Sequence, residues 1–177
     1  MDHADIRGLI EGGVDREGGA WADLGSGSGA FTLALAELLG PTGRIHSVDR
    51  DSRVLERQRQ AIQNEFPRTD VSYLTADFGS PLDLPPLDGV VMANSLHFFW
   101  RKEGVLELVR GYLKPGGRLV MVEYDADRGN PWVPHPISYP TWERLSAEAG
   151  FEGTRLLKRV PSRFLGAIYS ALSHRPP

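Results

Sequence analysis

Three glycines at alternate positions mark the stretch of the sequence best suited to binding a ligand. Gly25, Gly27 and Gly29, with Ser26 among them, follow the apolar run 21–24 and precede apolar residues at helical spacing. Glycine adopts positive φ readily and lacks the Cβ that would hold a ligand away from the backbone. The amino terminus of a following helix offers unpaired N–H groups and a partial positive charge. The stretch therefore predicts a loop that binds a nucleotide-like ligand.

Carboxylates lie in or just after the strands expected around this loop. Asp49 ends an apolar stretch about 20 residues beyond the glycines, the position of the ribose-binding acid in nucleotide-binding βαβ units. Asp77 follows the next expected strand, and Asp23 lies inside the strand before the loop. Asp49 could instead cap a helix, and Asp77 could instead start a turn. Asp23 is a charge in a strand expected to be buried, so it needs a partner.

Two further stretches carry histidine and aromatic side chains. Residues 94–100 follow the fourth expected strand, whereas residues 125–140 hold four prolines and are too long for a plain connector. His97 is either a solvated loop histidine or a general base. The aromatic side chains that follow it either pack in the interior or contact a substrate, namely Phe98, Phe99 and Trp100. The other candidates on this substrate side are Ser95, Phe98, Trp100, Trp132 and His135.

Alternating strand and helix patterns must position these residues. Strands are expected at 21–24, 44–49, 71–76, 87–93, 119–124, 154–160 and 164–172, and helices at 2–11, 29–39, 52–66, 105–112 and 142–149. The alternation predicts an α/β fold, a parallel sheet with helices on both faces. The last two strands are joined tightly and must be antiparallel. The ligand is expected at the carboxyl ends of the strands, beside the first and fourth.

Composition limits the possible classes of function. The 177 residues are enough for one domain spanning 1–177. A net charge of −3 gives no general attraction to nucleic acid or to an anionic membrane, although a local basic patch remains possible. The lack of cysteine excludes disulfides and thiolate metal ligands, and no metal site is expected. Neither a membrane-spanning run nor a signal-peptide core is found, so a cytoplasmic location is expected.

The motifs together are more specific than the glycine loop alone. Residues 21–29 (Trp-Ala-Asp-Leu-Gly-Ser-Gly-Ser-Gly) resemble the first motif of class I S-adenosylmethionine (SAM)-dependent methyltransferases, and Val48–Asp49 resembles their second. Ala76–Phe78 is similar to their acidic third motif, and residues 93–97 stand where the fourth lies. Residues 113–120 (Leu-Lys-Pro-Gly-Gly-Arg-Leu-Val) are similar to the signature before the fifth strand. The resemblance implies a Rossmann-like, seven-stranded, mostly parallel sheet in the order 3-2-1-4-5-7-6, with the seventh strand antiparallel.

The same resemblance implies roles for the residues around the loop. It implies that Asp49 binds the ribose of SAM, while backbone N–H groups of the glycine loop bind the methionine carboxylate. Carbonyls near Gly25 and Asn94 would bind the ammonium group, and Asp23 would orient this region. The residues implied around the adenine are Asp77 at its amino group, Phe78 beside the ring and Arg50 at its edge.

The predicted function is transfer of a methyl group from SAM to a small-molecule acceptor by in-line displacement, with His97 as the candidate base. The overall pattern is closest to methyltransferases of ubiquinone and menaquinone biosynthesis. Asn94-Ser-Leu-His97 stands where amino-methylating enzymes have Asn-Pro-Pro-Tyr. The alternatives are an NAD-dependent oxidoreductase and a non-catalytic SAM-binding module.

The expected partner is a small molecule, without nucleic acid or membrane, and a homodimer is possible. About 20 residues precede the first motif, fewer than such enzymes usually carry to cap the site. The site is therefore expected to be open, closed by residues 125–140 as a lid, or closed by a second subunit.

Overall fold

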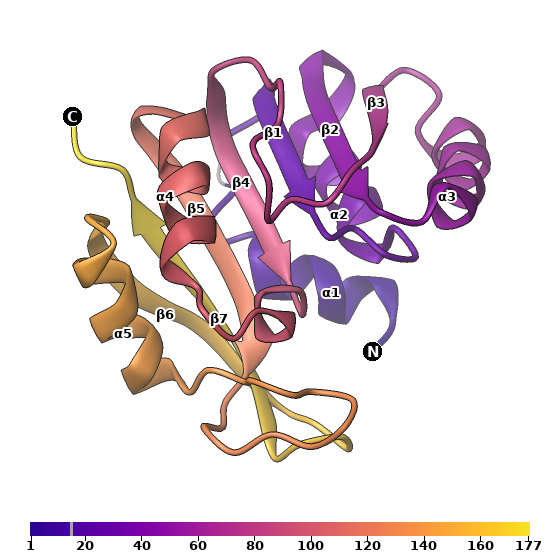
Figure 1. The fold of residues 1–177 in the computed structure, drawn as a ribbon. Coiled ribbons are helices and arrows are strands. Elements are labelled where there is room, and N and C mark those ends of the chain that lie inside the picture. Colours follow the sequence, from indigo (N-terminus) through magenta and orange to yellow (C-terminus); the bar gives the residue numbers. More distant parts are fainter. Residues whose placement is uncertain (15) are drawn as a thin grey trace.

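The computed structural model describes residues 1–14 and 16–177, and its elements alternate between strand and helix (Figure 1). The strands are β1 (Gly19–Leu24), β2 (Gly43–Asp49), β3 (Asp70–Thr75), β4 (Leu87–Ala93), β5 (Leu113–Tyr124), β6 (Glu152–Pro161) and β7 (Ala167–His174). The α-helices are α1 (His3–Ile10), α2 (Ala30–Leu39), α3 (Ser52–Glu65), α4 (Glu103–Tyr112) and α5 (Tyr139–Glu148). Two short 3-10 turns are η1 (Gly40–Thr42) and η2 (Leu96–Phe98).

The strands form one seven-stranded sheet in the order β3-β2-β1-β4-β5-β7-β6. The first five strands are parallel, and β7 runs antiparallel to both β5 and β6. The predicted fold class and strand order are therefore confirmed. The order reverses between β1 and β4, which places the carboxyl ends of these two strands on either side of the crevice where ligands bind in such sheets.

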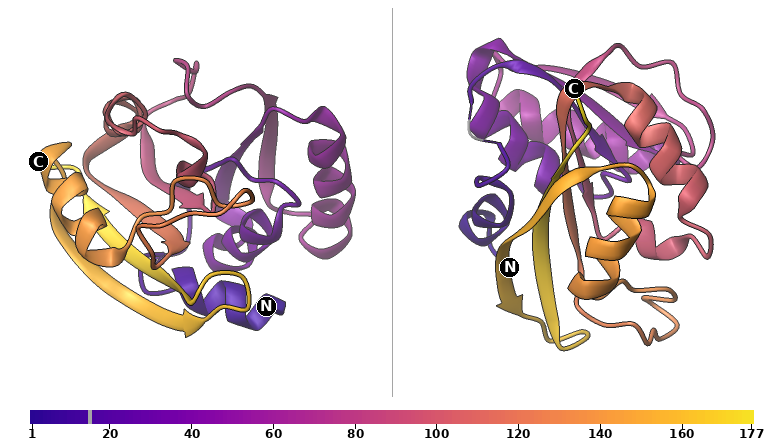
Figure 2. Two further views of the ribbon diagram at one scale, coloured as in Figure 1. Left: turned by 60° about the horizontal axis from the view of Figure 1, so that its bottom comes forward. Right: turned by 90° about the vertical axis from the view of Figure 1, so that its left-hand side faces the viewer.

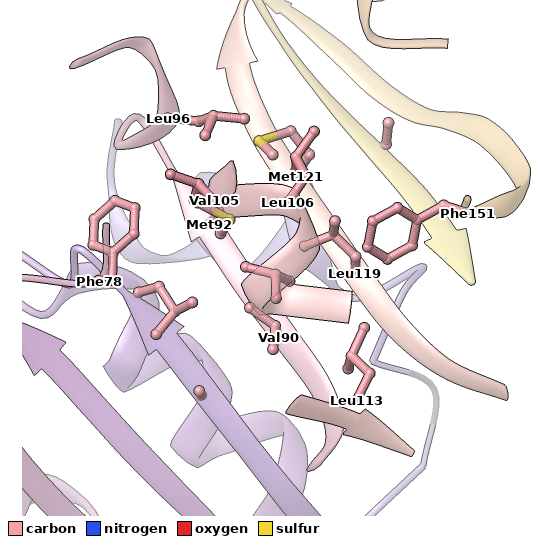
Figure 3. Close-up of a cluster of buried hydrophobic side chains, with 14 of the residues drawn as sticks. Phe78, Val90, Met92, Leu96, Val105, Leu106, Leu113, Leu119, Met121 and Phe151 are labelled. Carbon is pink, nitrogen blue, oxygen red and sulfur yellow. The ribbon is translucent and has the colours of Figure 1, made fainter. Parts of the chain in front are cut away.

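Alternating side chains of the central strands point to opposite faces of the sheet, as the period of two requires. In β5, Leu119 and Met121 pack with α4 and α5, whereas Val120 and Val122 pack on the side of α1, α2 and α3. Figure 3 shows the first of these clusters, around Val90 and Met92 of β4. Both faces of the sheet are thus covered, which explains the continuous apolar runs in its central strands.

Several expected boundaries differ from the structure: β1 begins at Gly19 rather than at 21, α5 at Tyr139 rather than at 142, and β7 at Ala167 rather than at 164. β5 begins at Leu113 rather than at 119, because Leu113 already pairs with Leu87 before a register shift at the Pro-Gly-Gly turn. The amino-terminal helix starts at His3, because Asp2 caps it by accepting a hydrogen bond from the N–H of Asp5 (2.9 Å).

Candidate functional site

A cavity of about 630 Å³ lies at the carboxyl ends of β1, β2, β3 and β4. Its wall is formed by residues 25–28, 30–31, 49–50, 76–78, 93–95 and 98–99, together with Met1 and Ile6. The structure therefore brings together the glycine loop, Asp49, Asp77 and Asn94, which lie far apart in the sequence. Its volume is in the range of small-molecule sites.

Gly25 turns the chain out of β1 in a conformation that requires glycine. Its φ is +77°, and a Cβ there would lie 2.6 Å from Cβ of Ser95 and 2.9 Å from Cε1 of Phe78. The N–H groups of Gly25 and Ser26 both donate to the carbonyl of Val48, which fixes the loop against β2. The backbone of the loop consequently forms one wall of the cavity without a side chain in the way.

A buried glutamine that the sequence reading did not single out supports the loop from behind. Nε2 of Gln58 donates to the carbonyl of Gly27 (2.6 Å) and to Oγ of Ser26 (2.9 Å). Oε1 of Gln58 accepts from Oγ of Ser47 (2.7 Å). The sequence does hold a signal for this residue. Gln58 lies on the apolar stripe of α3, between Leu55 and Ile62, where a polar side chain is unexpected and indicates a buried hydrogen-bonding role.

Asp49 ends β2 with its carboxylate at the cavity wall. Its Oδ2 accepts from the N–H of Gly27 and its Oδ1 from the N–H of Asp51, both at 2.9 Å. Each carboxylate oxygen can accept a second hydrogen bond, so the group is oriented but not saturated. Asp51, not Asp49, caps α3 with its side chain. Arg50 is exposed beside Asp49 and lines the cavity.

Asp77 and Phe78 line the cavity after the end of β3. Oδ1 of Asp77 accepts from the N–H of Gly79 (2.8 Å), so the turn-forming role weighed for this residue is present. The other oxygen, Oδ2, accepts no hydrogen bond from the part of the chain that the structure describes. The ring of Phe78 is buried and packs on Phe99, with centroids 5.0 Å apart.

Asp23 lies behind the loop rather than in the cavity wall. Its side chain is 1% exposed, and Oδ2 accepts from Oγ1 of Thr32 (2.7 Å). Burial raises the pKa of Asp23 to about 7, and the negative charge of Asp49 adds to the shift, while the Thr32 hydrogen bond opposes it. The hydroxyl of Thr32, near the start of α2, is thus the partner that the buried carboxylate requires.

Asn94 follows β4 in a strained conformation. Its φ of 50° is the only positive value at a non-glycine residue among residues 1–14 and 16–177. Oδ1 of Asn94 is buried and accepts no hydrogen bond from the described residues. A buried acceptor without a partner calls for an explanation, and Asn94 is also one of the residues that line the cavity. Its neighbour Ser95 is buried and donates from Oγ to the carbonyl of Leu24 (2.8 Å).

His97 is buried, so its reading as a solvated loop histidine is wrong. Its side chain is 3% exposed, and Nδ1 lies 3.0 Å from Oε2 of Glu123, which is fully buried in β5. The backbone N–H of His97 also donates to Glu123 (3.1 Å), and its carbonyl accepts from the N–H of His135. His97 is absent from the cavity wall and contacts Phe98, with ring centroids 4.4 Å apart and the rings tilted by 48°. Glu123 was not predicted from the sequence. The signal that could have found it is the presence of an acidic residue inside an apolar strand.

Exposure divides the aromatic candidates. Phe98 lines the cavity yet is exposed, and Trp100 is more exposed still, so packing in the interior is wrong for these two. Phe99 is partly buried and packs against the core, as expected, whereas Trp132 is exposed. Trp100 contacts His135 edge to face at 5.0 Å. The two stretches 94–100 and 125–140 therefore lie in contact, whereas Trp132 and His135 do not reach the cavity wall.

Helix α1 contributes to the cavity, which sequence reading did not foresee. Met1 and Ile6 line it, next to Phe31 of α2. Glu37 holds the two helices together, because its Oε2 lies 2.7 Å from Nε2 of His3 and its Oε1 lies 3.2 Å from Nε of Arg7. Together with Phe98 of η2, the side chains of Met1, Ile6 and Phe31 form a second wall of the cavity. We call it the apolar wall, in contrast to the polar loop wall formed by the glycine loop and the strand ends.

Fold, cavity and motifs define a methyltransferase domain. The model of the family described as "Methyltransferase domain" matches residues 15–151, and the chain belongs to this family. Among curated proteins, it is 30% identical over 118 residues to the ubiquinone/menaquinone biosynthesis C-methyltransferase UbiE of Erwinia tasmaniensis, covering 66% of this chain and 47% of that one. It is 29% identical over 143 residues to the 2-phytyl-1,4-naphtoquinone methyltransferase of Trichormus variabilis, covering 75% and 61%. The chain thus spans about half to three fifths of these relatives.

A solved structure shows the same fold at low sequence identity. The 1,6-didemethyltoxoflavin-N1-methyltransferase of Burkholderia thailandensis, solved with 1,6-didemethyltoxoflavin and S-adenosylhomocysteine, superposes with a TM-score of 0.80 at 16% identity. The match covers 99% of this chain and 78% of that one.

Two kinds of site are absent from the described residues. No helix within 1–14 and 16–177 is long and apolar enough to span a membrane. In the same part of the chain, no three histidine or carboxylate side chains gather as metal ligands would.

Proposed function

We propose that the cavity binds SAM and that the chain transfers its methyl group to a small-molecule acceptor. The observation that carries the proposal is the loop wall of the cavity, where the Gly25 turn, Asp49 and Asn94 line one space. SAM carries no phosphate, and its diol, carboxylate and ammonium groups match this mixture of acceptors and backbone donors.

Specific residues would hold the parts of SAM. Asp49 would accept hydrogen bonds from the ribose hydroxyls, using the lone pairs that the Gly27 and Asp51 N–H groups leave. The free oxygen of Asp77 would accept from the adenine amino group, with Phe78 beside the ring and Arg50 at its edge. Oδ1 of Asn94 would accept from the ammonium group. Asp23 would act indirectly, by fixing the start of α2 through Thr32.

The acceptor side is proposed to be the apolar wall of the cavity. When bound, SAM supplies an electrophilic methyl group, so the chain mainly has to orient an acceptor and exclude water. Phe98 and Phe31 would contact the acceptor, and Ser95 would hold the end of β1 through the Leu24 carbonyl. The names of the Erwinia and Trichormus relatives make quinone-type compounds the first acceptors to test.

His97 is proposed to act with Glu123 in positioning this wall. Glu123 binds both the ring and the backbone N–H of His97, which fixes η2 and thereby Phe98. A role of His97 as general base stays a prediction and requires Nε2 to reach the acceptor. Several further points also stay predictions. These are a single domain over 1–177, a lid formed by residues 125–140, a cytoplasmic location, a homodimer and the absence of a nucleic-acid acceptor.

Isothermal titration with SAM tests the cofactor proposal. We expect saturable binding that NAD does not displace, and Asp49→Ala should weaken it at least about tenfold, because charge-assisted hydrogen bonds to the ribose are lost. Asp83→Ala, at an exposed acid outside the cavity wall, is the matched control. Release of S-adenosylhomocysteine with an acceptor panel tests turnover. No binding at millimolar SAM, or displacement by NAD, would refute the proposal.

A further inference from the structure

Four large aromatic side chains are exposed at one end of the molecule. Phe98 is 57%, Trp100 78%, Trp132 71% and Phe164 60% exposed, and we call them the aromatic rim. Isolated exposed apolar residues are ordinary, but two tryptophans with most of their surface in solvent are costly without a partner. Phe98 also lines the cavity, so the rim includes the cavity's edge.

Contacts between three segments bring the rim together. The N–H of His135 donates to the carbonyl of His97 (3.1 Å), which joins residues 125–138 to η2. The N–H of Asp125 donates to the carbonyl of Ala167 (2.9 Å), which joins the same loop to the turn between β6 and β7. Figures 1 and 2 show this loop and this turn at the same end of the sheet, where the carboxyl ends of the parallel strands lie.

Each segment of the rim also carries an arginine without a partner. Arg101 follows Trp100, Arg128 precedes Trp132 in the loop, and Arg163 precedes Phe164. All three are exposed and make no hydrogen bond or ion pair within the described residues.

The acids of the long loop are engaged by other groups. Asp125 pairs with Arg159 at 2.7 Å and accepts from the N–H of Tyr139. Asp127 accepts from both the hydroxyl and the N–H of Ser138. Asp125 is thus neutralised by Arg159, whereas Asp127 keeps its negative charge because its Ser138 partners are neutral. The three arginines of the rim outnumber this one carboxylate, so the rim carries a local excess of positive charge, although the chain as a whole has a net charge of −3.

The charge of the rim distinguishes between its possible occupants. A second copy packed symmetrically on this surface would bring the same arginines together, and like charges across an interface are costly. An anionic lipid surface suits both features, because tryptophan and phenylalanine lie in the headgroup region while arginine binds phosphate. The net charge of −3 does not exclude a local basic patch of this kind.

We propose that the aromatic rim binds the surface of a membrane containing anionic phospholipid, with the mouth of the cavity facing the lipid. The attachment is peripheral and needs no spanning helix. It relies on the rim alone and does not depend on SAM binding, so it can be tested separately.

Vesicle co-sedimentation tests the proposal. We expect the chain to sediment with vesicles of phosphatidylcholine and phosphatidylglycerol, to stay in solution with phosphatidylcholine alone, and to be released by salt. Each arginine near an anionic surface is worth about fivefold in binding, so R101Q/R128Q/R163Q should bind about 100-fold more weakly. Tryptophan emission should shift to the blue on binding, because only Trp100 and Trp132 of the four tryptophans are exposed.

The matched control removes three exposed arginines elsewhere. R53Q/R57Q/R68Q changes the net charge by the same amount on and after α3 and should bind vesicles like the unchanged chain. Equal losses in both triple variants would overturn the proposal, as would failure to sediment with anionic vesicles at low salt. A dimer that W100S/W132S abolishes, without vesicle binding, would overturn it in favour of self-association. Melting temperature and SAM affinity, measured on each variant, should be unchanged.

Discussion

The two walls of the cavity are built differently. The loop wall is braced by buried hydrogen bonds from Gln58, Ser47 and Thr32, and its positive-φ glycines admit no other residue without strain. The apolar wall consists of Met1, Ile6, Phe31 and Phe98, of which Met1 and Phe98 have most of their surface in solvent. The loop wall is therefore organised before a ligand binds, whereas the apolar wall leaves room for different acceptors.

Gly25→Ala should break the loop wall most severely. The new Cβ would clash with Ser95 and Phe78 at a φ of +77°, so we expect SAM affinity to fall more than about 100-fold and stability to fall by about 2 to 4 kcal/mol. Gly116→Ala is the control, because Gly116 has a φ of +73° with nothing within 4 Å and lies outside the cavity wall. Similar losses in both variants would contradict the packing argument.

Glu123→Ala should damage the apolar wall through its support. It leaves the ring and N–H of His97 without their buried partner, at a cost of about 3 kcal/mol in denaturant unfolding. Turnover should fall while SAM affinity changes little in the folded fraction. Glu123→Gln keeps an acceptor for the backbone N–H and should recover part of both stability and turnover. Loss of SAM affinity alone would contradict the division between the walls.

Asp23→Asn should change how stability depends on pH. Because burial raises the pKa of Asp23 from 3.8 to about 7, the folded state binds the extra proton between these values, and stability falls as pH rises through them. Asparagine can still accept from Thr32 but carries no charge. Relative to the parent, the variant should thus gain about 2 to 3 kcal/mol on going from about pH 5 to about pH 8. Melting curves that run parallel for both chains across this range would show that Asp23 is not shifted.

Phe98→Ala should have the smallest effect on the fold. The side chain is largely in solvent, so we expect stability to change by less than about 1 kcal/mol and SAM affinity not at all. The KM for the acceptor should rise, because the residue lines the apolar wall. Phe99→Ala is the contrasting variant, since Phe99 packs on Phe78 and should cost stability. A weaker SAM affinity in Phe98→Ala would place the residue on the other wall.

Sequence patterns predicted the loop wall better than the apolar wall, for a physical reason. Glycine spacing, strand-end acids and the Lys-Pro-Gly-Gly turn are local signals, and the family resemblance that they carry implied the sheet order and the place of Asp49, Asp77 and Asn94 at the site. The Glu123–His97 pair and the part played by α1 depend on contacts between distant segments. Local periodicity carries no information on such contacts, so the burial of His97 could not be foreseen.

The most direct test of the account is a crystal structure of the chain with S-adenosylhomocysteine. The account predicts the ribose hydroxyls on the carboxylate of Asp49, the adenine beside Asp77 and Phe78, and the amino-acid end at the glycine loop and Asn94. The thioether should then face the apolar wall formed by Phe98 and Phe31. Adenosine bound against that apolar wall, or ligand bound only outside this cavity, would contradict the division of the cavity into a cofactor wall and an acceptor wall.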